Sequence, residues 1–210
     1  MPISITRRVL AALAAGAALA AAPVRAQDMP GGSDIARRAL HVCAACHGEG
    51  GRSRTAAYPH LAGLPAQYTV RQLKDFREQQ RAESDVAAYM WGVSALLDDD
   101  TIQSLADYYA VQAPAPGRSK APPKVLARGK FIFEAGIAER NVRACASCHG
   151  DKAEGAAGFP RLAGQHAAYM ERQLQVFSTR LRPHGVLMKA ETSNMSKAEM
   201  KAVAAYLQSM

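Results

Sequence analysis

The residues best suited to chemistry are two Cys-x-x-Cys-His motifs, Cys43 to His47 and Cys145 to His149, each followed by glycine. Two thiols three positions apart lie on one helical turn, where each can add to a vinyl group of haem and form a thioether bond. The adjacent histidine is then held beneath the haem ring and can bind the iron. The motifs predict two covalently bound haem c groups, attached through Cys43, Cys46, Cys145 and Cys148 and ligated by His47 and His149.

Other uses of a Cys-x-x-Cys pair fit this chain less well. Zinc ribbons pair two such motifs about 15–20 residues apart, whereas almost a hundred residues separate Cys46 from Cys145. A thioredoxin-like site follows a strand, and neither motif follows a segment with strand alternation. Disulfides are the usual use of an even cysteine count in an exported protein. The recurrence of the whole motif, with its histidine, favours haem.

Both motifs belong to an internal repeat, because the residues after the first motif recur in the same order 101 positions later. Between the copies, residues 113–124 contain four prolines, a composition typical of a semi-rigid linker. We therefore predict a first domain at 27–112, a linker at 113–124 and a second domain at 125–210. The matched pairs are Pro59/Pro160, Leu61/Leu162, Ala62/Ala163, Gly63/Gly164, Ala66/Ala167, Tyr68/Tyr169, Arg71/Arg172, Gln72/Gln173, Leu73/Leu174 and Phe76/Phe177.

Each domain is predicted to be all-α. Apolar residues recur at helical spacing from Tyr68 to Glu78 and from Tyr169 to Phe177. Asp98 and Ser196 are the expected N-caps of the last helix in each half, and Ser33 with Asp34 caps an expected helix that runs to the first motif. No segment shows the alternation of a strand. Because such small domains bury little apolar surface by themselves, we expect each to wrap around its haem.

The second axial ligand determines what each haem can do. Met90 is the only methionine between Met29 and Met170. It lies seven residues before the start of the last helix of its half, and Met188 lies at the same distance in the second half. We therefore predict that Met90 and Met188 bind the irons. The other methionines of the second half are expected to pack in the core or to lie at the chain end: Met170, Met195, Met200 and Met210.

Further residues could act around the haems. The backbone carbonyls of Pro59 and Pro160 are candidates to accept the ring N–H of the ligating histidines and so to orient them. Arg71 and Arg172 could pair with haem propionates, or they could lie on a solvated helix face. Four histidines have no histidine at the matching place in the other half, and we interpret them as surface or loop residues: His41, His60, His166 and His184.

The first 26 residues are predicted to be an export signal. Two arginines precede an apolar run at 9–22, and Val24-Arg25-Ala26 offers small residues for cleavage between Ala26 and Gln27. The run is too short and too rich in alanine for a membrane span. We therefore expect a mature protein in the periplasm that is at most peripherally bound to the membrane.

The charge pattern argues against a nucleic-acid partner. The formal net charge is +8, and three of the positive residues lie in the predicted signal. The remaining Lys and Arg residues are scattered and form no block of like charge. This distribution is typical of a solvated surface, with room for a docking patch that meets an acidic protein.

With these residues in place, the chain resembles the cytochrome c4 family, periplasmic dihaem proteins made of two class-I cytochrome c domains. The resemblance covers essentially the whole mature chain and is tightest at residues 136–140, at the second motif and at residues 158–166. It implies His/Met ligation in both halves, haems that face each other near the domain boundary, and electron delivery toward a terminal oxidase. The chain departs from the family pattern at Asp98, where a serine is usual, and has His60 where its second half has Arg161.

These predictions together indicate outer-sphere electron transfer. With histidine and methionine on each iron, no axial position is free for a substrate, and methionine ligation favours the ferrous state. The expected partners are redox proteins: a quinol-oxidising complex or a dehydrogenase as donor, and a terminal oxidase as acceptor. One alternative is a cytochrome subunit of a specific periplasmic dehydrogenase for sulfide or another sulfur compound. Another is a dihaem enzyme, such as a peroxidase or thiosulfate dehydrogenase, which would need an open iron and is not expected.

Overall fold

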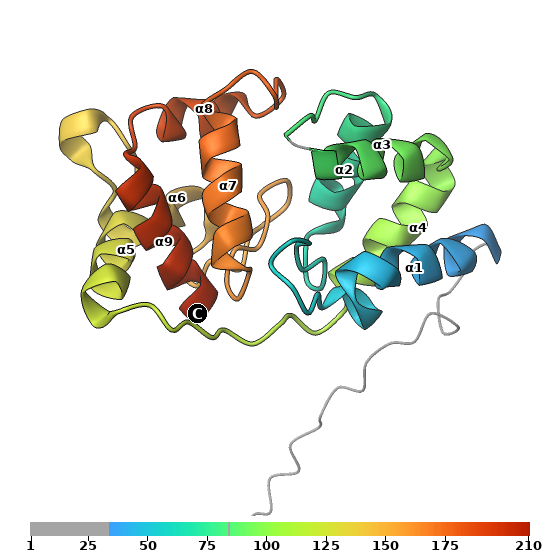
Figure 1. Cartoon of the computed structure of the whole chain (residues 1–210), viewed down its shortest axis with the longest axis horizontal. Coiled ribbons are helices and arrows are strands. Elements are labelled where there is room, and N and C mark those ends of the chain that lie inside the picture. The colour runs from blue at the N-terminus through green and yellow to red at the C-terminus, as the bar shows by residue number, and fades with distance from the viewer. Residues whose placement is uncertain (1–33, 84) are drawn as a thin grey trace, which may run out of the picture.

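The computed structural model describes residues 34–83 and 85–210, so the predicted signal peptide and Ser33 lie outside the described residues. The described chain forms two groups of helices side by side, joined by an extended strap (Figure 1). Within these residues the β structure consists of two isolated bridges, Ile137 to Val142 and Ala156 to Phe159. The predicted all-α fold class, with one group of helices in each half, is confirmed.

The core of the first half lies between its first and last helices. Ile102, Leu105 and Tyr109 on the last helix are buried against Leu40 on the first, as the helical spacing of the sequence indicates. In the described residues of this half the elements are α1 (Asp34–His47), the 3₁₀ turn η2 (Glu49–Gly51), α2 (Ala66–Arg77), α3 (Asp85–Ala95) and α4 (Asp99–Ala110).

The second half repeats this pairing of first and last helices with a larger core. Ile132 and Phe133 on its first helix pack with Val203 and Leu207 on its last. The elements are α5 (Pro123–Ala135), the 3₁₀ turn η3 (Ala138–Arg140), α6 (Ala146–His149), α7 (Ala167–Phe177), α8 (Val186–Thr192) and α9 (Lys197–Ser209).

The predicted helix starts agree with the structure. The side chain of Asp98 accepts from the backbone N–H of Thr101 at 2.7 Å and caps α4. Ser196 and Glu199 form the capping box of α9. Both α2 and α7 begin two residues before the predicted positions, at the end of the matched loops.

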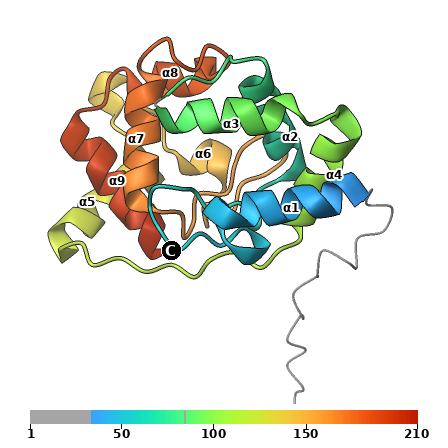
Figure 2. The ribbon, with the colours of Figure 1, turned by 45° about the vertical axis from the view of Figure 1, so that its right-hand side comes forward.

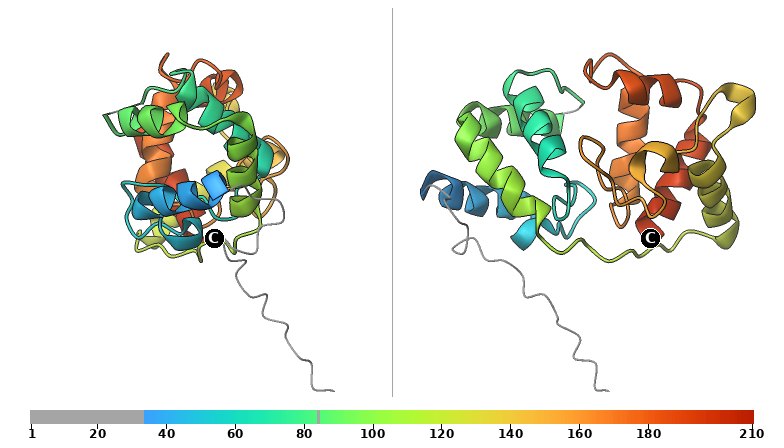
Figure 3. Two further views of the ribbon diagram at one scale, coloured as in Figure 1. Left: turned by 90° about the vertical axis from the view of Figure 1, so that its right-hand side faces the viewer. Right: turned by 180° about the vertical axis from the view of Figure 1, so that it is seen from behind.

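The strap between the halves packs against both of them. It occupies residues 111–122, because α5 begins at Pro123, two residues before the predicted start of the second domain at 125. Proline is tolerated at the first helical position. The strap runs along one side of the molecule (Figure 3). The backbone N–H of Arg118 donates to the carbonyl of Gln208 at 2.8 Å, so the strap is fixed to the end of α9.

Helices α3 and α8 were not expected from the sequence. They contain Met90 and Met188, and they lie at the same end of the molecule, the upper end in Figures 1 and 2. Among the described residues, no helix is both long enough and apolar enough to cross a bilayer.

Candidate haem sites

The first motif ends helix α1. Its thiols are free, with Cys43 half-buried and Cys46 exposed, whereas His47 is only 7% exposed. Nδ1 of His47 lies 2.9 Å from the carbonyl oxygen of Pro59, the contact expected from the sequence. Because a carbonyl oxygen can only accept, Nδ1 holds the proton, and Nε2 keeps the lone pair that a metal needs.

The second motif lies on the short helix α6 and has the same geometry. Nδ1 of His149 lies 2.9 Å from the carbonyl oxygen of Pro160, and His149 is 5% exposed. Each histidine also meets a matched aromatic ring edge-on: Tyr58 for His47, with centroids 6.1 Å apart, and Phe159 for His149, at 6.0 Å. The two imidazoles are therefore oriented by equivalent contacts.

The protonation of these groups suits iron binding. Burial lowers the pKa of His47 and of His149, and this effect outweighs the opposing contacts with the proline carbonyls. Both imidazoles are therefore neutral at pH 7. Burial also raises the pKa of the Cys43 thiol and raises the pKa of the Cys145 thiol to about 11, so both remain protonated thiols.

The donor set fits a covalently attached haem in each half. Two thiols and one neutral imidazole lie on one helical turn, and all four thiols are free of disulfides. The imidazole has one nitrogen fixed by the backbone, as metal-ligating histidines do.

The predicted methionine ligands are half-buried and stand among exposed apolar side chains. Met90 on α3 is flanked by Tyr89, which is 79% exposed, and Met188 on α8 follows Leu187, which is 59% exposed. By contrast, Met170 and Met200 are core residues, as the sequence indicates. Met90 and Met188 are therefore free of the protein core and stay the predicted sixth ligands.

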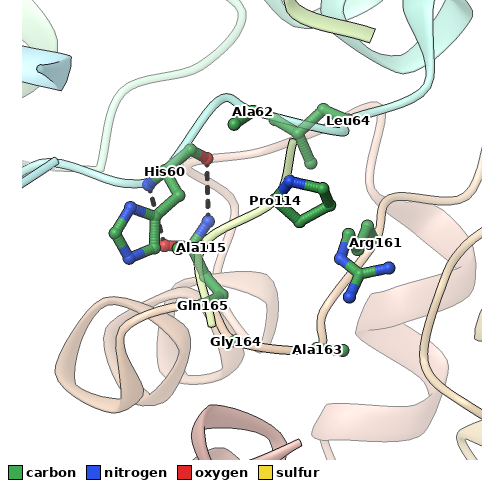
Figure 4. A pocket seen from close by; sticks show the side chains of 9 residues that line it. All are labelled: His60, Ala62, Leu64, Pro114, Ala115, Arg161, Ala163, Gly164 and Gln165. Carbon is green, nitrogen blue, oxygen red and sulfur yellow. Dashed lines mark hydrogen bonds between the residues drawn. The ribbon is translucent and has the colours of Figure 1, made fainter. Parts of the chain in front are cut away.

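Two of the histidines interpreted as surface or loop residues, His60 and His166, lie in loops, and these two loops meet at the boundary between the halves. The rings of His60 and His166 stack with centroids 4.1 Å apart. The Gln165 side chain accepts from the backbone N–H of His60 at 2.9 Å and donates to the carbonyl of His60 at 2.9 Å (Figure 4). It also accepts from the backbone N–H of His166 at 3.0 Å, so it fixes the stacked rings. The signal in the sequence is a mismatch of the repeat, since Gln165 matches Leu64.

The other two histidines lie at the surface. His41 is exposed, as interpreted. His184 is also exposed, but its Nδ1 lies 2.7 Å from a carboxylate oxygen of Asp75 in the other half. It therefore contributes to the boundary as well.

The arginines proposed for the propionates have other contacts in the structure. Arg71 is exposed and donates across the boundary to the carbonyl of Gly158. Arg172 lies over the ring of Tyr169, 5.7 Å from its centroid. Neither contact involves a haem-attachment residue, and the assignment of these two arginines stays a prediction.

Comparison with known proteins identifies the relatives of this chain. The family described as cytochrome c matches residues 33–109 and 126–210, one match for each half. A cytochrome c4 of Thiocapsa roseopersicina is 36% identical over 82% of this chain and 89% of its own length. A thiosulfate dehydrogenase electron acceptor of Thiomonas intermedia is 36% identical over 96% of this chain and 90% of its own length. Among solved structures, the cytochrome c4 of Acidithiobacillus ferrooxidans superposes with a TM-score of 0.71 at 38% identity, covering 80% of this chain and 98% of that one.

Proposed function

This chain belongs to the cytochrome c4 family and is an electron carrier with two covalently bound haem c groups, and we propose that it transfers electrons in the periplasm from a quinol-oxidising complex or a dehydrogenase to a terminal oxidase. The main support is the recurrence, in both halves, of free Cys-x-x-Cys thiols beside a buried histidine whose Nδ1 is fixed by a proline carbonyl. The predicted domains at 27–112 and 125–210 and the export signal at 1–26 are part of this proposal.

We assign one set of ligands to each half. When bound, each haem supplies a one-electron ferric/ferrous couple. The contacts of His47 with Pro59 and of His149 with Pro160 hold each imidazole in one orientation and increase its basicity. The soft, neutral methionine favours the ferrous state. The attachment residues are Cys43, Cys46, Cys145 and Cys148, and the axial ligands are His47, Met90, His149 and Met188.

This ligand set describes a carrier rather than an enzyme. Electron transfer at the haem edge needs no free axial position, whereas substrate turnover at iron does. The charge distribution fits docking to an acidic redox partner, because residues 125–210 contain twelve Lys and Arg against seven Asp and Glu.

A second candidate donor is a thiosulfate dehydrogenase. Two of the relatives are named thiosulfate dehydrogenase electron acceptors. A solved thiosulfate dehydrogenase from Marichromatium purpuratum has a TM-score of 0.69 at 36% identity, and the match covers 36% of that chain. Mixing the oxidised protein with a thiosulfate dehydrogenase and its substrate, and following haem reduction, distinguishes this donor from a quinol-oxidising complex.

The carrier proposal is tested through the sixth ligands. The ferric holo protein should show the near-infrared charge-transfer band of methionine-ligated haem, and the ferrous protein should not bind carbon monoxide. Met90→Ala and Met188→Ala should each lose about half of the band and open one haem to carbon monoxide, because each removes one of two ligands. Carbon monoxide binding by the wild type would instead show an open iron and favour an enzyme.

A further inference from the structure

One peptide group at the boundary between the halves forms a hydrogen bond on each of its two sides. The N–H of Ala82 donates to the carbonyl of Leu181 in the other half at 2.9 Å. The carbonyl of the same peptide group, which belongs to Arg81, accepts from the indole N–H of Trp91 at 2.7 Å. Because the N–H and C=O of a trans peptide point in opposite directions, this peptide group connects the second half to the side chain of Trp91.

The side chain of Arg81 fixes this peptide group further. It is 5% exposed, lies 4.5 Å from the ring centroid of Phe76, and pairs with Glu83. Across the boundary it donates to the hydroxyl of Tyr169 at 3.0 Å and to Oε1 of Gln173 at 3.1 Å. Both halves therefore hold Arg81, and the position of its carbonyl depends on both.

Trp91 lies next to the predicted sixth ligand of the first haem. It follows Met90 on α3 and is half-buried. An indole N–H can only donate, so the bond to the carbonyl of Arg81 anchors α3 at the residue after the methionine. Two hydrogen bonds in series thus lead from Leu181 of the second half to the neighbour of Met90.

The matching peptide group of the second half cannot make the same connection. Pro183 stands where the first half has Ala82, and proline has no N–H to donate across the boundary. Lys189 follows Met188 where α3 has Trp91, and its side chain is exposed. The residue types at these positions therefore do not repeat the path that leads to α3.

The second half has its own contacts with the first, and they lie at the turn before α8. Arg182 donates to Oε1 of Gln72 in the first half. Nδ1 of His184 lies 2.7 Å from a carboxylate oxygen of Asp75. The carbonyl of Arg182 accepts from the backbone N–H of Gly185 at 2.9 Å, and Gly185 is the N-cap of α8. These three bonds fix the turn, but none of them reaches a residue within α8.

Within α8 the methionine is held by its own helix. The hydroxyl of Thr192, which is 1% exposed, donates to the carbonyl of Met188 at 2.8 Å. Ser94 has the matching place on α3 and is fully buried, but its hydroxyl has no hydrogen-bond partner in the part of the chain that the structure describes. Met90 lacks this local bond, and its helix is anchored through Trp91 instead.

We propose that Trp91 is a positioning residue for Met90: through Arg81 it ties α3 to the second half, so the bond between Met90 and the first haem iron depends on contacts between the halves. Met188 is held differently, by a bond within its own helix. The inference rests on the proposed function, which makes both methionines sixth ligands. Because methionine ligation favours the ferrous state, loosening the boundary lowers the reduction potential of the first haem more than that of the second.

The test compares Trp91→Phe with Tyr89→Phe in the holo protein. The two residues flank Met90, and each variant keeps an aromatic ring. Trp91→Phe loses the N–H that bonds to Arg81, whereas Tyr89 is 79% exposed and its variant loses a hydroxyl at the surface. Imidazole, which competes with methionine for ferric iron, is titrated into each protein. Binding is followed at each haem by its methyl resonances, assigned with Met90→Ala and Met188→Ala.

Trp91→Phe should let the first haem bind imidazole about tenfold more tightly, because the lost hydrogen bond no longer anchors α3. The second haem should keep the affinity of the wild type. Tyr89→Phe should behave like the wild type at both haems. A residue that only stabilises the fold would lower the urea midpoint and leave the imidazole affinity of both haems unchanged.

A second variant tests the dependence on the other half without changing the first. Tyr169→Phe removes a hydroxyl that accepts from Arg81. It should increase the imidazole affinity of the first haem about threefold, a smaller change because Arg81 keeps its other partners. The haem of its own half should be unchanged. The control is Tyr68→Phe, at the matching tyrosine of the first half, which should have no effect. If Trp91→Phe does not retain haem, this pair decides.

The proposal is overturned if Trp91→Phe and Tyr89→Phe give the same imidazole affinity at the first haem. Equal affinities for Tyr169→Phe and Tyr68→Phe would overturn the dependence on the second half. The wild type tests the proposed function by itself: a first haem that binds carbon monoxide when ferrous would show that Met90 is not its ligand. A wild type with two methionine ligands, together with variants that have no effect, would contradict this inference alone.

Discussion

The two halves hold the same motif in different surroundings. In the first half, α1 runs without a break from Asp34 into the motif. In the second half, α5 ends before Gly136, and a loop with η3 and the left-handed Asn141 precedes α6. Both histidines nevertheless lie 2.9 Å from their proline carbonyls. The orientation of the ligating histidine is therefore set by the loop after the motif and not by the helix before it.

The loop residues at the boundary between the halves, by contrast, differ between the two copies of the repeat. His60 of the first half matches Arg161 of the second, and Leu64 matches Gln165. As a result Gln165 bonds to His60 across the boundary, whereas Leu64 at the matching place has no side-chain donor or acceptor for an equivalent contact. Duplication preserved the cofactor contacts, while the contacting loops diverged to form an unequal interface.

The largest loss of stability is expected in the second half, where two helices approach each other closely at a glycine. A Cβ on Gly129 of α5 would lie 2.1 Å from the carbonyl oxygen of Ala202 on α9, so Gly129→Ala must push the two helices apart. We expect a loss of about 3 kcal/mol in the free energy of unfolding, measured by urea denaturation of the holo protein.

The matched control lies in the first half. A Cβ on Gly92 of α3 would have no atom within 4 Å, so Gly92→Ala should stabilise its helix by about 0.5 kcal/mol. Equal midpoints for the two variants would contradict the close approach of α5 and α9.

A smaller loss of stability is expected at the boundary between the halves, where Gln165 has no glutamine at the matching place. Gln165→Leu gives the second half the residue found in the first, and it removes the partners of two backbone N–H groups and one carbonyl at His60 and His166. The expected loss is about 1–3 kcal/mol, with faster hydrogen exchange at these two amides. Gln175→Leu, which changes a half-buried glutamine with one long contact to Glu171, should cost less; an equal cost would show that Gln165 does not join the halves.

The features that follow from local sequence could be predicted. The capping residues Asp98 and Ser196, the faces of α2 and α7, and the carbonyls of Pro59 and Pro160 depend on residues within one half, and the repeat supplies each signal twice. The haem motif could be predicted for the same reason, because its spacing alone places two thiols and an imidazole on one helical turn.

Features that need both halves could not be predicted. The sequence around His60 has no apolar periodicity that would indicate burial. The residues that cover His60 come from a loop 105 positions later, which local sequence cannot reveal. Arg81 and Arg182 look like ordinary charged residues after a helix, and only the fold places both beside Gln72 and Gln173. Helix α8 begins after Gly185, which has no side chain to cap it, so the sequence carries no capping signal there.

The caps of the last helices allow a finer comparison. Ser196 accepts from the backbone N–H of Glu199, whose carboxylate in turn accepts from the N–H and hydroxyl of Ser196 and pairs with Arg140 and Arg128. Ser196→Ala should therefore cost about 1 kcal/mol, measured by thermal unfolding. Asp98→Ala should cost less, because the exposed Asp98 caps α4 through contacts with Thr101 and has no reciprocal carboxylate like that of Glu199. The reverse order would show that the capping box adds nothing in the folded protein.

The smallest predicted effect is a loss of folding stability at acidic pH that comes from a residue at the boundary between the halves. Burial, together with the ring of His166, lowers the pKa of His60 to about 4. An unfolded chain takes up a proton at this histidine near pH 6.5, whereas the folded protein does not until about pH 4. The stability contributed by neutral His60 is therefore present above pH 6.5 and lost as pH falls toward 4. Because His60 is only half-buried, solvent reduces the size of this loss.

The measurement is the shift of the urea midpoint between about pH 7 and about pH 5. The wild type should lose more than His60→Gln, and the exposed His41→Gln should behave like the wild type. The cap of α9 does not interfere, because contacts with Arg140 and Ser196 outweigh burial and lower the pKa of Glu199 to about 2, so its contribution is lost only below about pH 4.5. A pH response in His60→Gln as large as that of the wild type would show that His60 does not contribute to the acid sensitivity of the protein, because the variant should lose the part that comes from this histidine.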